Sequence, residues 1–522
     1  MGSCLRVCTA ASCRSRGGKQ LEQALAAAAS STDLRVKEVG CLGPCSDGPL
    51  ITLDIDGDGQ RNSHMLALAP GMAQQVAQSL SAALASASGL SHWTPPGSRA
   101  IHTEAPFLRL QRRLVLAQCG RIDPGCIDDA VAAGAYQQLE RVLEQNNPEA
   151  VIDTVRRSGL RGRGGAGYPT GLKWATVAAM PGDTKVVVCN ADEGDPGAFM
   201  DRTLMEGDPH TLLEGMAIAA FAVGAHQGFL YVRAEYPLAI ERLHTAIAAA
   251  KARGWLGTGI AGSRFSFDID LRVGAGAYVC GEETALIHSI EGQRGVPRPR
   301  PPYPAEHGVF GRPTLINNVE TFGNVPALLQ LGVEAYGSGT KVFSLTGHVR
   351  CSGVLEVPIG TTLRTIVETM GGGARPGHRI KAVQTGGPSG GCVPASALDT
   401  PVDYESLKSL GTIMGSGGMV VMDETTNMVD IAAFFIAFSR EESCGKCIPC
   451  RSGTVQLELL LRKLLERRAC LADLSQLESL CHTVAAASLC GLGQSAPKPV
   501  LSTLRHFRDD YLALLEPAEV SP

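Results

Sequence analysis

Three cysteines separated by two residues each constrain this chain more than any other feature of its sequence. They occupy the run from Cys444 to Cys450, and a fourth cysteine, Cys490, follows within a second short run that is rich in glycine. Three thiolates at C-x2-C-x2-C spacing and a remote fourth are the ligands expected of a [4Fe–4S] cluster. Structural zinc more often uses two separated C-x2-C pairs or a mixture of cysteine and histidine. Zinc and unligated thiols remain the alternatives, and a cluster implies that electrons pass through the chain.

The length and charge of the chain exclude several classes of protein. A chain of 522 residues is too long for one hydrophobic core and predicts several domains. A net charge of -4 gives no reason to expect nucleic acid or an anionic membrane as a partner. The most apolar long run, residues 216–232, is interrupted by His226 and Gln227, so no membrane span is expected. The start of the chain lacks an apolar secretory signal, which predicts a cytoplasmic location with cysteines as metal ligands and not disulfides.

A second set of cysteines lies in the first 50 residues, within a small unit of alternating strands and helices. The pattern predicts a strand at 4–8, a helix at 19–30 and strands at 34–39 and 50–54, and this order suits a thioredoxin-like domain over residues 1–92. Residues 91–100 are interpreted as a linker. Two pairs of cysteines at strand-to-loop junctions suit a [2Fe–2S] cluster, with zinc or a degenerate copy without a cluster as alternatives. These cysteines are Cys8, Cys13, Cys41 and Cys45.

A glycine-rich run at residues 159–174 is the first candidate for a binding site. Gly162, Gly164 and Gly167 satisfy G-x-G-x-x-G, but a helix beginning near Asn147 and Pro148 precedes them, so an ordinary Rossmann first turn is rejected. Bare backbone N–H groups, with the nearby cations of Arg163 and Lys173, still favour a phosphate or a flat ring. A flexible surface loop is the alternative. Upstream, residues 112–117 are predicted to form a strand, and a helix is expected after residue 128 or 129.

Polar groups follow several strands that resemble those of a parallel sheet. Strands are expected at 185–189, 229–232 and 265–273, with a helix at 238–252, and ligands bind at the carboxyl ends of such strands. Glu282 and Glu283 would repel a 2′-phosphate and so favour NAD over NADP, although acids at a helix N-terminus are the structural alternative. Further candidates are the acids and amides at strand ends and one aromatic ring. They are Asn190, Asp192 and Glu193, the amides Asn317 and Asn318, for which a turn or cap is the alternative, and the ring of Tyr303.

Five motifs in colinear order resemble one family. The run from Gly162 to Lys173, the segments 190–193, 280–284 and 317–321, and the stretch from Glu442 to Arg451 together look like the NADH-binding flavoprotein subunit of respiratory complex I. That subunit type is shared with the diaphorase subunits of NAD-reducing hydrogenases and NAD-dependent formate dehydrogenases. The resemblance covers roughly residues 110–515. It implies FMN, NAD(H) and one [4Fe–4S] cluster, with hydride passing directly between nucleotide and flavin and no side chain acting as a catalytic acid or base.

The resemblance also implies domains and binding residues. It predicts an α/β multidomain chain with a Rossmann-like FMN- and NADH-binding domain at 93–337, a β-grasp domain at 338–428 and a helical bundle with the cluster at 429–522. Residues matching the family's flavin contacts are Gly162, Arg163, Gly164, Lys173, Asn190, Asp192, Gly281, Glu282, Asn317 and Asn318. Those matching its nucleotide contacts are Gly165, Ala166, Tyr168, Glu193, Glu283 and Tyr303, and Gly167 and Tyr278 complete the candidate cofactor set. The chain departs from the family at Tyr168 and Tyr303, where phenylalanine is common, and at Thr176, where an aromatic residue is often found.

The segment before residue 93 is a further departure from a free-standing complex I subunit. It resembles the thioredoxin-like [2Fe–2S] subunit without its leading helices, and such a fusion is expected of diaphorase subunits. The partners implied are NAD(H), a small thioredoxin-like [2Fe–2S] subunit and a large Fe–S or molybdenum catalytic subunit. On this resemblance a formate dehydrogenase is the favoured assembly, with an NAD-reducing hydrogenase, complex I, or a relay subunit without nucleotide turnover as alternatives. A zinc-binding scaffold is the remaining class.

Overall fold

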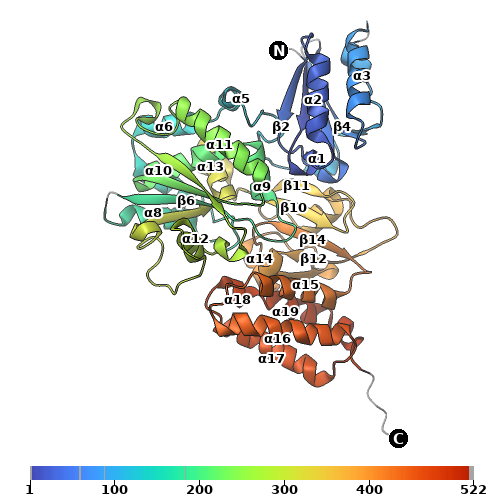
Figure 1. The fold of residues 1–522 in the computed structure, drawn as a ribbon, viewed down its shortest axis with the longest axis vertical. Helices are drawn as coiled ribbons and strands as arrows, with labels where there is room; N and C mark the ends of the chain where they lie inside the picture. Colours follow the sequence, from blue (N-terminus) through green and yellow to red (C-terminus); the bar gives the residue numbers. More distant parts are fainter. Residues whose placement is uncertain (1–2, 58–59, 87–88, 183, 517–522) are drawn as a thin grey trace.

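The computed structural model describes residues 3–57, 60–86, 89–182 and 184–516. Within these ranges the chain forms two five-stranded sheets, one four-stranded sheet and a helical region at its C-terminal end. The N-terminal unit and the C-terminal helices lie at opposite ends of the long axis, with the other two sheets between them (Figure 1). This arrangement places the two groups of cysteines at opposite ends of the central α/β region.

The N-terminal unit is a mixed sheet covered by helices on one side. β1 pairs in parallel with β2 and antiparallel with β3, and the strand order is β2-β1-β3-β4-β5. The strands and main helices are β1 (Cys4–Cys8), α2 (Gly18–Ala29), β2 (Arg35–Val39), β3 (Leu50–Gly57), β4 (Gln60–Leu68), α3 (Ala73–Leu84) and β5 (Ser98–Ile101). The linker expected at 91–100 is wrong in part, because β5 pairs with β4 and the sheet continues to Ile101, past residue 92.

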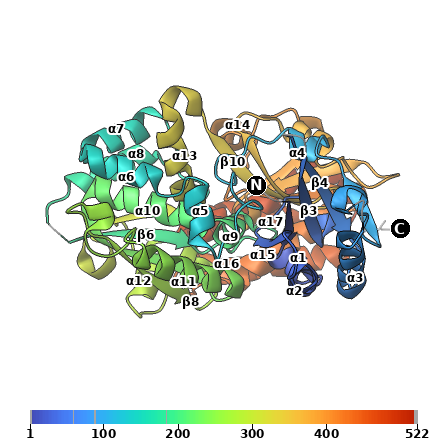
Figure 2. The same ribbon diagram turned by 90° about the horizontal axis from the view of Figure 1, so that it is seen from above.

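The central region is a parallel sheet in the order β8-β7-β6-β9. Its strands are β6 (Lys185–Ala191), β7 (Ala225–Arg233), β8 (Asp268–Gly274) and β9 (Thr314–Asn318). Val186, Val187 and Val188 are fully buried, as the apolar run predicted, because helices cover the sheet. Two of these helices are α10 (Pro209–Val223) and α11 (Pro237–Ala252) (Figure 2). The strand order reverses between β6 and β9, and ligands of open α/β sheets bind at such a switch point.

The strand expected at 112–117 is wrong. The backbone N–H groups of Leu114, Val115 and Leu116 do not face another strand; they donate to the carboxylate of Glu356 at 2.9, 3.0 and 2.9 Å. A buried carboxylate therefore replaces a neighbouring strand as the acceptor. The helices expected nearby are present as α5 (Ile127–Ala132) and α7 (Pro148–Arg157). Asn147 caps α7, since its side chain accepts from the N–H of Ala150 at 3.1 Å.

The third sheet is mixed and has the order β11-β10-β14-β12-β13. The two hairpin strands that the sequence predicted are present, and β10 also pairs in parallel with the late strand β14. The elements are β10 (Thr340–Gly347), β11 (Gly353–Pro358), the π-helical turn η6 (Thr365–Met370), β12 (Ile380–Thr385), β13 (Gly391–Pro394) and β14 (Gly418–Asp423). One edge of this sheet touches the N-terminal unit, where the Val354 N–H donates to the Gly43 carbonyl at 3.1 Å.

Helices make up the C-terminal region. Leu457, Leu461, Leu477 and Val484 form part of its buried core. The principal helices are α15 (Met428–Glu441), α16 (Ile448–Leu465), α17 (Leu471–Ala487), α18 (Gly491–Ser495) and α19 (Lys498–His506). Across the described part of the chain, every helix is too short or too polar to cross a membrane.

Candidate functional site

The four cysteines singled out near the C-terminus line one cavity. Cys444, Cys447, Cys450 and Cys490 meet there, with Val279 and Pro297 of the central region in the wall. Cys447 precedes the first residue of α16, and Cys490 precedes the first residue of α18. Backbone N–H groups at helix N-termini favour negative charge, so both positions suit thiolates. The fold thus brings the distant Cys490 to the C-x2-C-x2-C run.

The chemistry of this cavity fits a cationic metal centre. Burial raises the pKa of Cys450 to about 11, so this thiol holds its proton unless a cation compensates the thiolate. The Leu489 N–H lies 3.5 Å from Cys447 Sγ, and Ser443 Oγ lies 3.3 Å from Cys450 Sγ. Hydrogen bonds to sulfur are typical of Fe–S sites. Four cysteine sulfurs with no histidine in the cavity wall match the ligand set expected of a [4Fe–4S] cluster.

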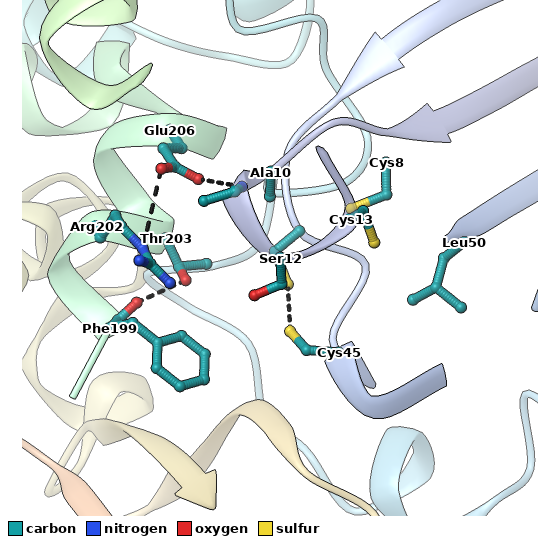
Figure 3. Close-up of a pocket in the computed structure, with 12 residues that line it drawn as sticks. Cys8, Ala10, Ser12, Cys13, Cys45, Leu50, Phe199, Arg202, Thr203 and Glu206 are labelled. Carbon is teal, nitrogen blue, oxygen red and sulfur yellow. Dashed lines mark hydrogen bonds and ion pairs between the residues drawn. The ribbon is translucent and has the colours of Figure 1, made fainter. Parts of the chain in front are cut away.

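The four N-terminal cysteines also share one cavity. Cys8, Cys13, Cys41 and Cys45 line it from the N-terminal unit, and the other wall is formed by the helix α9 (Met200–Gly207) and its preceding residue, Phe199 (Figure 3). The Sγ atoms of Cys41 and Cys45 are 3.5 Å apart. A hydrogen bond to Cys13, together with burial, raises the pKa of Cys8. These two pairs therefore form one four-sulfur site that fits a [2Fe–2S] cluster.

The glycine-rich run forms a loop between α7 and α8 (Thr170–Ala179). A helix and not a strand precedes the glycines, as predicted, so the loop is not the first turn of an ordinary Rossmann fold. Gly164, Ala166 and Tyr168 face outward, whereas Arg163 and Gly167 face the interior. A Cβ atom on Gly167, whose φ is +64°, would lie 2.5 Å from the Tyr404 ring. A Cβ on Gly164 would lie 3.0 Å from Asn318 Cβ. The loop thus needs glycine to pack against the end of β9 and against Tyr404 at the start of the helix α14 (Tyr404–Ser409).

The predicted amides meet at the carboxyl edge of the parallel sheet. Asn190 and Asn318 are register partners on β6 and β9. Asn190 Nδ2 donates to the Gly281 carbonyl at 2.9 Å. Asn318 is the N-cap of α13 (Val319–Tyr336), and Asn317 Oδ1 accepts from Trp174 Nε1 at 2.9 Å. The cap alternative is therefore correct for Asn318, and the three amides fix the edge of the candidate site.

Several buried polar atoms at this edge have no hydrogen-bond partner in the described ranges. They include Oδ2 of Asp192 and the Nε and Nη2 atoms of Arg163. Burial raises the pKa of Asp192 to about 7, because the carboxylate has lost water without gaining a donor. FMN offers ring N–H and ribityl hydroxyl donors at one end and a phosphate at the other. An acceptor atom and guanidinium N–H groups without hydrogen-bond partners are complementary to that ligand, so the residues present fit FMN.

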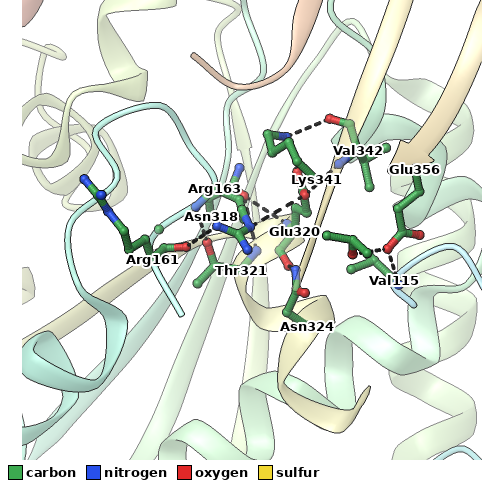
Figure 4. Close-up of polar contacts among 12 residues, drawn as sticks. Val115, Arg161, Arg163, Asn318, Glu320, Thr321, Asn324, Lys341, Val342 and Glu356 are labelled. Carbon is green, nitrogen blue, oxygen red and sulfur yellow. Dashed lines mark hydrogen bonds and ion pairs between the residues drawn. The ribbon is translucent and has the colours of Figure 1, made fainter. Parts of the chain in front are cut away.

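A buried ionic cluster surrounds Arg163 (Figure 4). Arg163, Glu320 and Lys341 are 1%, 2% and 0% exposed, with Arg163 Nε 4.0 Å from Glu320 Oε1 and Lys341 in an ion pair with Glu320. The Arg163 backbone N–H donates to Thr321 Oγ1 at 2.8 Å, which ties the glycine-rich loop to the start of α13. Two cations against one carboxylate leave net positive charge next to the loop. Such a balance favours a bound anion such as phosphate.

The acid pair has two different environments. Glu282 caps α12 (Glu283–Ile290), since its Oε2 accepts from the N–H groups of Thr284 and Ala285, both at 2.9 Å. Glu283 forms an ion pair with Lys173 at 2.5 Å and lies 3.7 Å from Arg300. The helix-terminus alternative is therefore correct for Glu282. Only part of the pair's negative charge remains available to oppose a 2′-phosphate.

A cavity of about 360 Å³ adjoins this acid pair and reaches the C-terminal cysteines. Its wall consists of Glu282, Arg298, Pro299, Arg300, Tyr303, Leu489 and Cys490. Tyr303 is 53% exposed and Tyr168 is 49% exposed, so both rings are open to a stacking ligand. Two arginines of this wall were missed by the sequence analysis, although they lie in the same proline-rich run as Tyr303.

The remaining candidates are occupied by contacts within the protein. Glu193 is buried, and its carboxylate accepts from the N–H groups of Asp201 and Arg202 at 3.0 and 3.1 Å, so it caps the start of α9. Tyr278 donates its hydroxyl to Asp195 Oδ1 at 2.7 Å. Gly165 forms an isolated backbone bridge with Gly415, which lies in the loop before β14. Arg202 and Glu206, which face the N-terminal cysteines, carry no sequence motif that could have revealed them.

A glycine-rich loop at the switch point of a parallel sheet, with a four-cysteine site next to it, defines a flavin- and Fe–S-containing electron-transfer protein. Comparison with known families gives the same class. Residues 155–327 match the Nuo51 FMN-binding domain, 342–393 the SLBB domain, and 430–514 the iron-sulfur binding region of NADH-ubiquinone oxidoreductase F.

Relatives of known name place the chain in one family. It is 51% identical over 410 residues to the NADP-reducing hydrogenase subunit HndC of Solidesulfovibrio fructosivorans, covering 77% of this chain and 83% of that one. It is 44% identical over 392 residues to the second NADH-quinone oxidoreductase F protein of Rhizobium meliloti, covering 74% and 93%. The H2-reduced NAD+-reducing [NiFe]-hydrogenase is similar in structure, with a TM-score of 0.69, 30% identity and coverage of 99% and 85%. The chain belongs to the NADH-quinone oxidoreductase F family, and its cofactors are FMN and a [4Fe–4S] cluster, with NADH as substrate.

Proposed function

We propose that the chain is the diaphorase subunit of an NAD-reducing hydrogenase, moving electrons between NAD(H) and Fe–S clusters through FMN. The buried atoms of Asp192 and Arg163 that lack hydrogen-bond partners support the flavin, and they are the observation that carries the proposal. The similarity to the NAD+-reducing hydrogenase extends over 99% of the chain and so includes the N-terminal unit. That extent favours a hydrogenase partner over the formate dehydrogenase that the sequence analysis favoured, which stays a prediction without support.

The chain's own residues hold the two ends of the flavin and admit the nucleotide. When bound, FMN exchanges hydride with nicotinamide and passes electrons singly to clusters. Asp192 Oδ2 would accept a hydrogen bond from the flavin, and the Arg163 guanidinium would compensate the charge of its phosphate, because both groups have buried polar atoms without a hydrogen-bond partner. The exposed rings of Tyr168 and Tyr303 would offer their faces to the nucleotide. Direct hydride transfer between nucleotide and flavin would require no side chain as a proton donor or acceptor. Cys444, Cys447, Cys450 and Cys490 hold the cluster that receives or returns electrons.

The N-terminal unit is proposed to hold a [2Fe–2S] cluster on Cys8, Cys13, Cys41 and Cys45. The N-terminal unit and the C-terminal helices lie at opposite ends of the long axis (Figure 1), and each contributes four cysteines to its own cavity, so the chain would offer the flavin two candidate electron acceptors. Chemical analysis of the holoprotein tests this: six iron atoms per chain are expected with both clusters filled, against four with the cubane alone.

A direct assay tests the diaphorase activity. The FMN- and iron-loaded chain is expected to reduce an artificial dye with NADH, and Asp192→Ala is expected to lose flavin and activity together. A matched control is Asp270→Ala, which removes an exposed carboxylate on the far strand β8. A loaded chain that binds FMN but transfers no electrons from either NADH or NADPH would favour the relay subunit without nucleotide turnover.

A further inference from the structure

The N-terminal cysteine cavity is closed by a helix from a different part of the chain. Arg202, Thr203 and Glu206 of α9 line it, opposite the cysteines (Figure 3). The segment that follows β6 contains Asp192 and leads directly into α9. A charged helix of the flavin-binding half therefore forms part of the environment of the N-terminal cysteines.

Several contacts fix the position of this helix against the N-terminal unit. The Glu206 Oε2 atom accepts from the Ala11 N–H at 2.9 Å, and Ala11 begins the short helix α1 (Ala11–Arg14) that contains Cys13. Arg242 of α11 donates to the Glu206 carbonyl of α9 and also to Thr9 Oγ1 at 2.8 Å and Glu38 at 2.6 Å. The N-terminal unit is thus joined to α9 and α11 by hydrogen bonds from backbone and charged groups, and α9 cannot move away from the cavity without breaking them.

Arg202 is held in place by aromatic rings and by an acid. Its guanidinium lies 5.3 Å from the centre of the Phe199 ring and 5.4 Å from that of Tyr236. Its Nε atom is 3.9 Å from Glu206 Oε1. The Arg202 backbone N–H is also bound by the carboxylate of Glu193, at 3.1 Å. These contacts restrain the Arg202 guanidinium in the cavity wall.

Glu206 is the opposite charge in the same wall. Its side chain is 2% exposed, against 25% for Arg202. Burial raises the pKa of Glu206, and the hydrogen bond from Ala11 opposes that rise. The cavity thus has one cation and one carboxyl group on its α9 side.

We propose that Arg202 and Glu206 set the reduction potential of the N-terminal cluster, with opposite signs. Reduction adds one negative charge to the cluster, which a nearby cation stabilises and a nearby carboxylate destabilises. Arg202 therefore raises the potential, and Glu206 lowers it. Because both belong to α9, whose first N–H groups are bound by Glu193 beside the flavin site, the flavin-binding half of the chain sets the potential of a cluster held by the N-terminal unit. This inference rests on the proposed [2Fe–2S] cluster.

The test is a redox titration of the holoprotein followed by EPR, with the C-terminal cluster in the same sample as an internal reference. Arg202→Gln is expected to shift the midpoint potential of the N-terminal cluster to more negative values, and Glu206→Gln to more positive values. Arg202→Lys keeps the charge and is expected to lie between Arg202→Gln and the parent. The C-terminal cluster is expected to keep its potential in all three. Arg253→Gln, which removes an exposed arginine paired with Asp128, is the matched control and is expected to shift neither cluster.

The outcomes separate the inference from the proposed function. A parent chain without an N-terminal cluster signal and with only four iron atoms contradicts the proposed cluster, and this inference with it. A cluster that is present but keeps its potential in both glutamine variants, or shifts in the same direction in both, contradicts the inference alone. Where a variant loses the cluster, the iron content reveals that loss, and Arg202→Lys then decides whether charge or packing is responsible.

Discussion

The ammonium of Lys173 lies 2.5 Å from the carboxylate of Glu283, so a residue of the glycine-rich segment is paired with the acid next to the N-cap of α12. The pair is half-buried, with 24% and 29% of the two side chains exposed. This contact changes the interpretation of the acid pair. Glu282 is used in capping, and Glu283 is partly neutralised, so the preference for NAD depends on the charge balance around Glu283 and not on two free acids.

The first prediction concerns nucleotide preference. Glu283→Gln removes the remaining negative charge and releases Lys173, and both effects favour a 2′-phosphate. We expect kcat/KM for NADPH to rise about tenfold relative to NADH, which corresponds to roughly 1.4 kcal/mol. The measurement is steady-state dye reduction with each nucleotide, with Glu334→Gln as an exposed control. An unchanged ratio would mean that Glu283 plays no part in the discrimination.

The second prediction concerns the pH dependence of flavin affinity. The pKa of Asp192 is raised by burial to about 7 from its ordinary value of 3.8, so the carboxyl is largely protonated below neutral pH when flavin is absent. A flavin donor that binds the ionised form makes FMN affinity rise with pH, by up to about tenfold per unit below pH 7, and level off above it. Flavin fluorescence titrations measure this, and Asp192→Asn should remove the dependence.

The raised pKa of Asp192 also affects the stability of the flavin-free protein. Whereas flavin affinity should rise with pH, this contribution to the free energy of unfolding falls as pH rises. A folded-state pKa above the unfolded value contributes stability that is fully present below about 3.8 and is lost as pH rises through about 7. Urea unfolding of the flavin-free parent and of Asp192→Asn should therefore converge at low pH and separate near neutrality, with Asn the more stable. Flavin affinity that falls as pH rises would show that this carboxyl donates to FMN instead of accepting.

The third prediction concerns stability at the contact between the central region and the third sheet. Glu356 accepts the N–H groups of Leu114, Val115 and Leu116 and the hydroxyl of Thr340 (Figure 4). Glu356→Gln replaces charged acceptors by one neutral oxygen and places an amide N–H₂ among donors. We expect a loss of about 2–4 kcal/mol in the free energy of unfolding, measured with urea. The exposed Glu334→Gln should lose less than about 0.5 kcal/mol, and equal losses would refute the role of Glu356.

The fourth prediction tests the remote cluster ligand. Cys490→Ala should abolish the cubane EPR signal and lower the iron content while FMN remains bound, because the flavin-side contacts come from other elements. Cys470→Ala removes an exposed thiol at the start of α17 and should leave the signal intact. A cubane signal that persists in both Cys490→Ala and Cys444→Ala would show that the cavity does not hold the cluster.

Much of the fold follows from local patterns in the sequence. The apolar strands β6 and β7, the Asn-Pro start of α7 and the leucine-rich helices α16 and α17 were all predictable, because periodicity and capping act within a few residues. The strand expected at 112–117 failed for a long-range reason. Its donors bind Glu356, more than two hundred positions away, and no local pattern contains that partner.

Some residues of the candidate site could be predicted from local sequence patterns, and others are revealed only by contacts in the folded structure. Cysteine spacing and glycine-rich runs identified both cysteine sites and the loop, because metal-ligand spacing and clustered glycines can be recognised in the sequence itself. The sequence could not show that Lys341 lies buried against Glu320, because that contact joins different elements. It also did not show that Glu193 caps α9, because the intervening loop, which no motif defines, brings the carboxylate back to the start of the helix. Arg202 and Glu206 are ordinary helix residues in the sequence and gain a role only where α9 meets the N-terminal unit.

We propose that electrons pass between NAD(H) and the C-terminal cluster through FMN, so NADH added to the loaded chain should reduce both. An anaerobic titration of the FMN- and iron-loaded chain with NADH, followed by absorbance and EPR, tests it directly. We predict that the flavin band bleaches and that the cubane signal appears with it, and that in Cys490→Ala the bleaching remains while the cubane signal is lost. A flavin band that stays oxidised with excess NADH, or a cubane reduced by NADH in a chain stripped of FMN, would contradict the account.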